Sequence, residues 1–191
     1  YSAFVAAQKS RTPILYVGGN DGMLHGFSAT DGKEMIAYVP RGVVSGLKDL
    51  TDKDYEHRYY VDGSPMTGDI KDGTDWKTLL VGTLGAGGKG YFVLDVTNPA
   101  SFGTAAASSL VVMDRTRSAN EAAPNCSTLS GAAKTACNTT VEEDKDIGNI
   151  VAQPGRNPAN KQEATQITRL NNGRWAVVMG NGYNSTNQRP V

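Results

Sequence analysis

The sequence predicts an all-β protein, a partial β-propeller with antiparallel blades and long loop insertions. Short apolar runs that end in Gly recur three times, at Val17-Gly18, Val81-Gly82 and Met179-Gly180. The chain also contains 22 Gly residues, which favours many tight turns between short strands. No segment shows an apolar stripe of helical period that is long enough to anchor an α/β fold.

The first predicted blade lies within residues 14–39. Two β-prone runs in residues 14–27 flank Asn20-Asp21-Gly22, a sequence that favours a tight hairpin turn with positive φ. A second turn at residues 29–33 leads into a third run at residues 34–39. Three strands joined by two short turns make most of one propeller blade.

Two further copies of this plan are predicted downstream. The second has an apolar run at residues 76–84, a Gly-rich turn at residues 85–90 and a return strand at residues 91–96. The third begins with residues 174–182. These runs are continuously apolar, which is typical of inner strands covered on both faces by neighbouring blades. Their spacing is irregular and longer than the usual repeat of about 40–45 residues, which predicts long insertions between blades.

We expect residues 1–191 to be a fragment of a single propeller domain, because Tyr1 is not an initiator Met. The longest insertion is predicted at about residues 101–163, where small and polar residues dominate. Within it, residues 127–137 have a composition that suits a short helix. Insertions of this kind usually form surface loops on one rim of a propeller.

Cys126 and Cys137 are the two cysteines of the chain, and both lie in this insertion. Their spacing predicts a disulfide that closes a short loop and stabilises the fold by roughly 2–3 kcal/mol. Such a bond indicates an oxidising compartment outside the cytoplasm. The alternative is a pair of free surface thiols. A metal site is less favoured, because the spacing is too wide for a CxxC knuckle and neither His is nearby.

Charge and hydropathy exclude two classes of partner. The 19 basic and 19 acidic residues balance, and the basic residues are scattered. The sequence therefore lacks the positive footprint of nucleic-acid binding. No apolar run approaches the roughly 18–20 residues of a membrane span.

Two acidic clusters are candidate calcium ligands. Asp69, Asp72 and Asp75 lie near Gly73, but their spacing of three differs from that of an EF-hand loop, and a solvated hairpin turn explains them better. The second cluster consists of Glu142, Glu143, Asp144 and Asp146. Such runs are usually exposed and solvated, although a role in binding calcium or a partner is an alternative.

The remaining candidate motifs favour structural roles. His25 and His57 each stand alone, which gives no support for zinc, and His25 is expected to be hydrogen-bonded within a strand. The Gly-rich residues 85–90 lack the Ser or Thr and the following helix of a phosphate loop, so they are predicted as a hairpin loop. We therefore expect no catalytic, cofactor-binding or metal-binding residue in this segment.

Several of these motifs, taken together and in this order, resemble the C-terminal propeller of the PilC/PilY family of type IV pilus adhesins. The resemblance covers about half of the chain. It is carried by residues 15–29, 61–65, 75–82, 85–97 and 172–185. Residues 146–148 also resemble a family element, but in the family that element leads quickly into a strand, whereas here residues 155–163 intervene.

The resemblance implies a distorted propeller of the quinoprotein type in a non-enzymatic adhesin or assembly factor at the pilus tip. It implies twitching motility and cell adhesion as functions, minor pilins or a host receptor as partners, and an extracellular location at the pilus tip or bacterial surface. Some family members carry a calcium site in this domain. No matching Asp-rich loop occurs here, so we expect that site, where present, beyond Val191.

Two other functions remain open from the sequence. Asp31-Gly32-Lys33 also resembles the blade repeat of quinone-dependent (PQQ) dehydrogenases, many of which carry an adjacent Cys-Cys pair that this chain lacks. The other alternative is a generic extracellular propeller lectin or scaffold. Fold similarity alone does not establish activity in either case.

Overall fold

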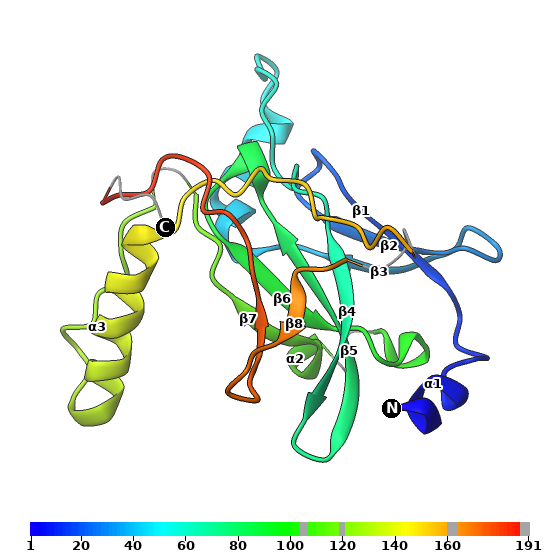
Figure 1. Cartoon of the computed structure of the whole chain (residues 1–191). Helices are drawn as coiled ribbons and strands as arrows, with labels where there is room; N and C mark the ends of the chain where they lie inside the picture. The colour runs from blue at the N-terminus through cyan, green and yellow to red at the C-terminus, as the bar shows by residue number, and fades with distance from the viewer. Residues whose placement is uncertain (104–106, 119–120, 160–163, 188–191) are drawn as a thin grey trace.

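The computed structural model describes residues 1–103, 107–118, 121–159 and 164–187, and it contains three antiparallel sheets (Figure 1). Among the described residues, no helix combines the length and apolar character that crossing a membrane requires. The helical elements outside the sheets are mostly short. They are α1 (Ser2–Ala7), η1 (Arg41–Thr51), η2 (Gly85–Gly87), η3 (Pro99–Ser101), α2 (Ala107–Leu110) and α3 (Gly131–Asp146).

The first sheet is the three-stranded blade that the sequence predicts. It consists of β1 (Ile14–Gly18), β2 (Leu24–Ser28) and β3 (Glu34–Tyr38), in that spatial order. The turn between β1 and β2 places Gly22 at φ +92°, a left-handed conformation that Gly adopts without steric cost. The side chain of Asp21 accepts a hydrogen bond from the Met23 amide at 3.1 Å, which fixes the turn.

The second sheet has four strands, and the sequence predicted only the middle two. Its order is β4 (Met66–Asp72), β5 (Asp75–Thr83), β6 (Tyr91–Asp95) and β7 (Val111–Asp114). β5 and β6 are the predicted apolar strands. β7 lies inside the range expected as an insertion, residues 101–163, so that range also supplies one edge strand of this sheet.

The third sheet is a small hairpin of β8 (Ile167–Arg169) and β9 (Trp175–Val177). Its turn holds Gly173 at φ +82°. The predicted run at residues 174–182 is thus a strand only over its first half, and its partner β8 precedes it in the chain.

The second sheet lies between the other two and is buried on both faces. One face presents Leu80, Phe92 and Leu94 to the first sheet, in the main hydrophobic cluster. The other face presents Val81 and Val93 to the third sheet, in a smaller cluster. Continuous apolar runs in β5 and β6 are what such two-sided burial requires.

Gly82 and Phe92 form a size-matched pair across β5 and β6 at the centre of this sheet. They are directly opposite in register, and Phe92 is fully buried. A Cβ atom on residue 82 would lie 2.2 Å from Phe92 Cζ, so the ring occupies the space that a side chain would need.

We predict that Gly82→Ala lowers the free energy of unfolding by about 1–3 kcal/mol, because the Phe92 ring must leave its packed position. Gly180→Ala is the matched control, since no atom lies within 4 Å of a Cβ at that position. Urea unfolding of the propeller domain that contains this chain measures both. Equal stability of the two variants would contradict the packing described here.

Candidate functional site

Helix α3 projects from the stacked sheets and is the most prominent surface element (Figure 1). It has 16 residues, of which Asp144 is the buried one. A helix that is polar all round has no apolar face to hold it against a core. Its position must therefore be fixed by specific ties at its ends.

The first tie is the disulfide between Cys126 and Cys137, as the cysteine spacing predicts. It joins the segment before α3 to the second turn of the helix, with a Cα–Cα distance of 5.9 Å. The helix predicted at residues 127–137 is found in part, because α3 begins at Gly131 and continues through the acidic run to Asp146.

The second tie is an ionic cluster at the C-terminal end of α3. Asp144 accepts a hydrogen bond from Arg115 Nε at 2.7 Å and forms an ion pair with Arg117. The side chain of Asp144 is only 6% exposed, and both arginines are largely buried. These two residues follow β7, so the cluster fastens α3 directly to the second sheet.

This cluster differs from the sequence expectation at Asp144, which lies in an acidic run expected to be solvated. The other members of the run are exposed or half-buried. Glu142 pairs with Lys145 at 2.6 Å, Glu143 with Arg115 at 3.2 Å, and Asp146 accepts a hydrogen bond from Asn187. Sequence reasoning missed the arginine partners because they lie in another element, 27 and 29 residues away.

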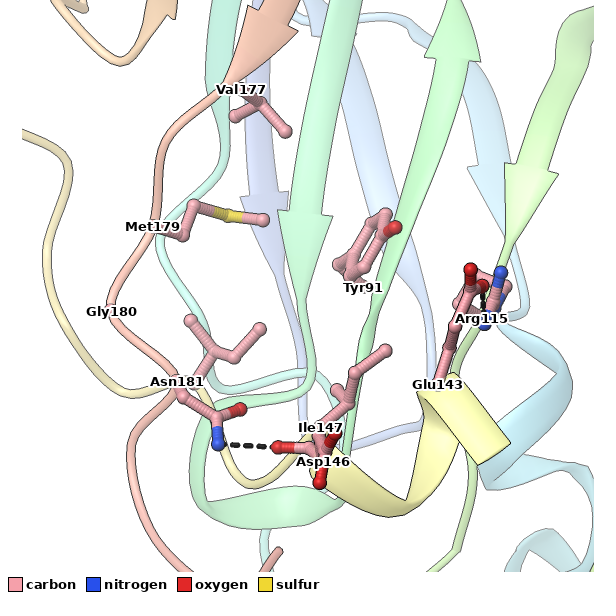
Figure 2. A pocket seen from close by; sticks show the side chains of 10 residues that line it. Tyr91, Arg115, Glu143, Asp146, Ile147, Val177, Met179, Gly180 and Asn181 are labelled. Atoms are coloured by element: carbon pink, nitrogen blue, oxygen red, sulfur yellow. Dashed lines mark hydrogen bonds and ion pairs between the residues drawn. The ribbon is translucent and has the colours of Figure 1, made fainter. Parts of the chain in front are cut away.

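A cleft of about 390 Å³ lies beside this cluster (Figure 2). Its walls come from the second sheet, the end of α3, and the end of β9 with the segment that follows it. Met179 and Val177 make an apolar side, while Glu143 and Arg115 lie at a charged edge (Figure 2). The full lining is Tyr91, Arg115, Glu143, Asp146, Ile147, Ile150, Val177, Met179, Gly180 and Asn181.

Asn181 lines the cleft and links the segment after β9 to residues 146–148. Its side chain donates a hydrogen bond to the Asp146 carbonyl and accepts one from the Gly148 amide at 2.8 Å. An apolar wall with a charged edge suits non-covalent recognition of an amphipathic side chain or peptide. The cleft and α3 together are the candidate functional site.

The first candidate calcium cluster is dispersed along a hairpin. Asp69 lies within β4 and accepts hydrogen bonds from Thr78 at 2.7 Å and from Tyr1 at 2.8 Å. Asp72 faces Asp75 across the predicted hairpin turn and pairs with Lys77 at 2.8 Å. Within the described residues, no group of three or more His, Cys, Asp or Glu side chains is placed to hold a metal ion.

The Gly-rich residues 85–90 form the predicted hairpin loop between β5 and β6. The loop packs tightly on its surroundings. A Cβ at Gly87 would lie 2.0 Å from the Tyr60 carbonyl oxygen, and one at Gly90 would lie 2.1 Å from that of Arg115. Gly residues are therefore required here by close backbone approach rather than by phosphate binding.

His25 lies in β2, hydrogen-bonded as expected, and both of its ring nitrogens contact carboxylates. Nδ1 lies 2.6 Å from Oε1 of Glu34, and Nε2 lies 2.8 Å from Oδ2 of Asp21. Two carboxylate acceptors favour an imidazolium that donates from both nitrogens. The hydrogen bond to Glu34 raises the pKa of His25 above its ordinary value of 6.5, Asp21 adds to this, and burial opposes it. The other histidine, His57, is exposed and contacts Tyr59.

Comparison with known proteins identifies the family of this chain. The family model of the PilY1 beta-propeller domain matches residues 1–123. The chain belongs to the PilY1 propeller family. The resemblance expected from the sequence motifs is thereby confirmed, as is the prediction of an all-β, partial propeller.

The PilY1 relatives extend the match over nearly the whole chain. A type IV pilus biogenesis factor PilY1 from Pseudomonas aeruginosa is 39% identical over 99% of this chain, and a PilY1 homolog from Xylella fastidiosa is 38% identical over 97% of it. The chain spans only 13% and 12% of the length of these relatives.

A solved PilY1 structure confirms the fold. The crystal structure of the Pseudomonas aeruginosa PilY1 C-terminal domain matches 98% of this chain with a TM-score of 0.59 and 36% identity. The match covers 28% of that crystallised chain. The three stacked sheets therefore share their fold with part of that domain.

We predict that Asp144→Asn destabilises the PilY1-type propeller domain by about 3–5 kcal/mol, because it leaves two largely buried arginines without their shared carboxylate. Glu142→Gln is the matched control on the same helix, and its exposed pair with Lys145 contributes at most about 0.5 kcal/mol. Urea unfolding measures both, and hydrogen exchange in α3 locates the effect. Similar losses of stability for the two variants would contradict the role of the Asp144 ionic cluster in holding α3 on the second sheet.

We predict that the stability contributed by His25 depends on pH. Because the folded pKa is raised above 6.5, the contribution is complete below pH 6.5 and is lost as the pH rises through the folded value. His25→Gln should remove this part of the pH dependence, whereas His57→Gln should leave it unchanged. NMR titration of the ring gives the pKa directly, and a value at or below 6.5 would contradict the assignment.

Proposed function

We propose that this chain is part of a type IV pilus biogenesis factor, in which it acts as a non-enzymatic scaffold. The observation that carries the proposal is the match to PilY1 biogenesis factors over nearly the whole chain. The stacked antiparallel sheets supply a rigid base, and α3 with its neighbouring cleft supplies a surface for a partner.

The partner surface combines apolar and charged groups. Met179 and Ile147 offer apolar contact, Glu143 and Asp146 offer carboxylates, and Glu143 pairs with Arg115 at 3.2 Å. Such a mixed cleft suits a protein segment, and we propose a minor pilin at the pilus tip or a host-cell receptor as its source. A disulfide in the same insertion supports an extracellular location at the pilus tip or bacterial surface.

The proposal requires no cofactor in this segment. A calcium site elsewhere in the parent protein is compatible with it, since this chain spans a small share of its relatives. Adhesion and twitching motility are then properties of the parent protein to which this segment contributes a contact surface.

An in-frame deletion of the parent gene tests the proposal. We expect loss of surface pili, restored by the intact gene, and this result would support an assembly role. Retained pili with lost attachment to host cells would make the protein chiefly an adhesin. If pili, twitching and attachment were all unchanged, with no second copy in the genome, the pilus function would be refuted.

Complementation with paired variants then tests the cleft itself. We predict that Glu143→Lys reduces piliation or attachment severalfold, because it reverses a charge at the cleft edge. Glu142→Lys changes the same charge on the same helix, but Glu142 does not line the cleft, so it should restore function fully. Immunoblots must show equal amounts of both proteins. Equal activity of the two variants would remove the cleft from the proposal.

A further inference from the structure

The C-terminal end of α3, beside the cleft, carries an excess of negative charge. The acidic run supplies four carboxylates there, and the described ion pairs bring them three cations, Lys145, Arg115 and Arg117. Among the residues that the structure describes, Asp146 forms no ion pair, and its Oδ1 accepts a hydrogen bond from the Asn187 side chain at 2.7 Å. One carboxylate charge in this region is therefore left without a described cation.

Arg115 lines the cleft, but its hydrogen bonds are already used by α3. Its Nε donates to Asp144 at 2.7 Å, and its Nη2 donates to the Thr140 carbonyl at 3.3 Å and to Glu143 at 3.2 Å. An incoming carboxylate would have to displace these acceptors, and breaking a buried charge pair is costly. Arg115 therefore supports the wall of the cleft and is a poor site for an acidic partner.

The two carboxylates that line the cleft are positioned to hold a cation together. Glu143 and Asp146 are three positions apart on α3, so they are neighbours on the helix surface (Figure 2). Oε1 of Glu143 and Oδ2 of Asp146 accept no hydrogen bond from the described part of the chain. The C-terminal end of a helix also carries a negative partial charge. All three features favour a cation at this edge.

The rest of the cleft wall is mainly apolar. Val177 and Met179 come from β9 and the segment after it, and Ile147 and Ile150 come from the segment after α3. The volume of about 390 Å³ is near the lower end of the range for ligand pockets, roughly 300–1,000 Å³. The cleft therefore suits one or two side chains, and the flexible Met179 can adapt to an aliphatic group.

We propose that this cleft binds a lysine or arginine side chain of the partner protein. The aliphatic stem of that side chain packs on Met179 and Ile147, and the carboxylates of Glu143 and Asp146 hold its cation. Lys and Arg are the side chains that combine a long apolar stem with a cationic end. Complementary charge of this kind gives specificity to an interface. The inference rests on the proposed role of the cleft as a partner surface and adds the chemistry of the partner.

A peptide titration of the parent propeller domain tests this chemistry. Blocked pentapeptides of Ala-Leu-Xaa-Leu-Ala carry lysine, arginine, norleucine or glutamate at the centre, and norleucine keeps the stem of lysine without its charge. The methyl NMR signal of Met179, assigned with Met179→Leu, reports occupancy of the cleft. We expect the lysine or arginine peptide to shift this signal and to bind severalfold more tightly than the norleucine peptide, with a smaller advantage at high salt.

Two results of this titration would overturn the proposal. One is binding of the norleucine or glutamate peptide that equals or exceeds that of both basic peptides. The other is a Met179 signal that no basic peptide shifts.

Variants of the domain that remove single charges locate the cation. Glu143→Gln and Asp146→Asn should each weaken binding of the basic peptide severalfold, while both keep a side-chain oxygen for the existing hydrogen bonds. Glu142→Gln is the matched control on the same helix, and because Glu142 does not line the cleft it should bind like the wild type. Wild-type affinity in both cleft variants would refute the assignment. If a variant melts at a lower temperature, the comparison of peptides on the wild-type domain decides alone.

Complementation with Glu143→Lys separates this inference from the proposed function. If that variant impairs piliation or attachment but basic peptides have no advantage over norleucine, the cleft remains a partner surface and the cationic chemistry is wrong. If basic peptides bind as expected but Glu143→Lys restores function fully, the proposed role of the cleft fails, whereas its preference for a cationic side chain stands.

Discussion

The two-sided burial of the second sheet is the constraint on which the rest of the structure depends. β5 and β6 place Leu80 and Phe92 against the first sheet and Val81 and Val93 against the third. A strand with apolar side chains on both faces cannot lie at a surface without exposing one of them. The flanking sheets are therefore needed for the central one to be stable, which explains why blades of this kind occur as stacks.

The projecting helix follows a different physical rule. α3 gains little from apolar burial, and its position is fixed by a disulfide near one end and by the Asp144 cluster at the other. The disulfide restricts the unfolded chain, whereas the cluster orients the folded helix on the second sheet. Because the two ties act at opposite ends, the surface between them can vary in sequence without disturbing the core.

The sequence predicted the elements whose signals are local. Apolar runs revealed β5 and β6, Asn20-Asp21-Gly22 revealed the first hairpin, and the cysteine spacing revealed the disulfide. β4 was missed because its sequence, Met-Thr-Gly-Asp-Ile-Lys-Asp, has no apolar run. That strand forms because it pairs with β5, and the sequence of the strand alone does not predict such pairing.

The candidate site shows the same limit more sharply. The acidic run was visible in the sequence, but nothing in the neighbouring residues distinguished Asp144 from the other acidic residues. Its burial depends on its two cationic partners, Arg115 and Arg117, which follow β7. The cleft likewise combines β6, the end of α3 and the segment after β9, which meet only in the folded chain. Local composition therefore locates the insertion, whereas the tertiary fold decides which of its residues hold it in place and which can face a partner. Glu143 and Asp144 illustrate this difference. They are adjacent in sequence, but Asp144 is buried in the ionic cluster, whereas the side chain of Glu143 is mostly exposed at the cleft edge.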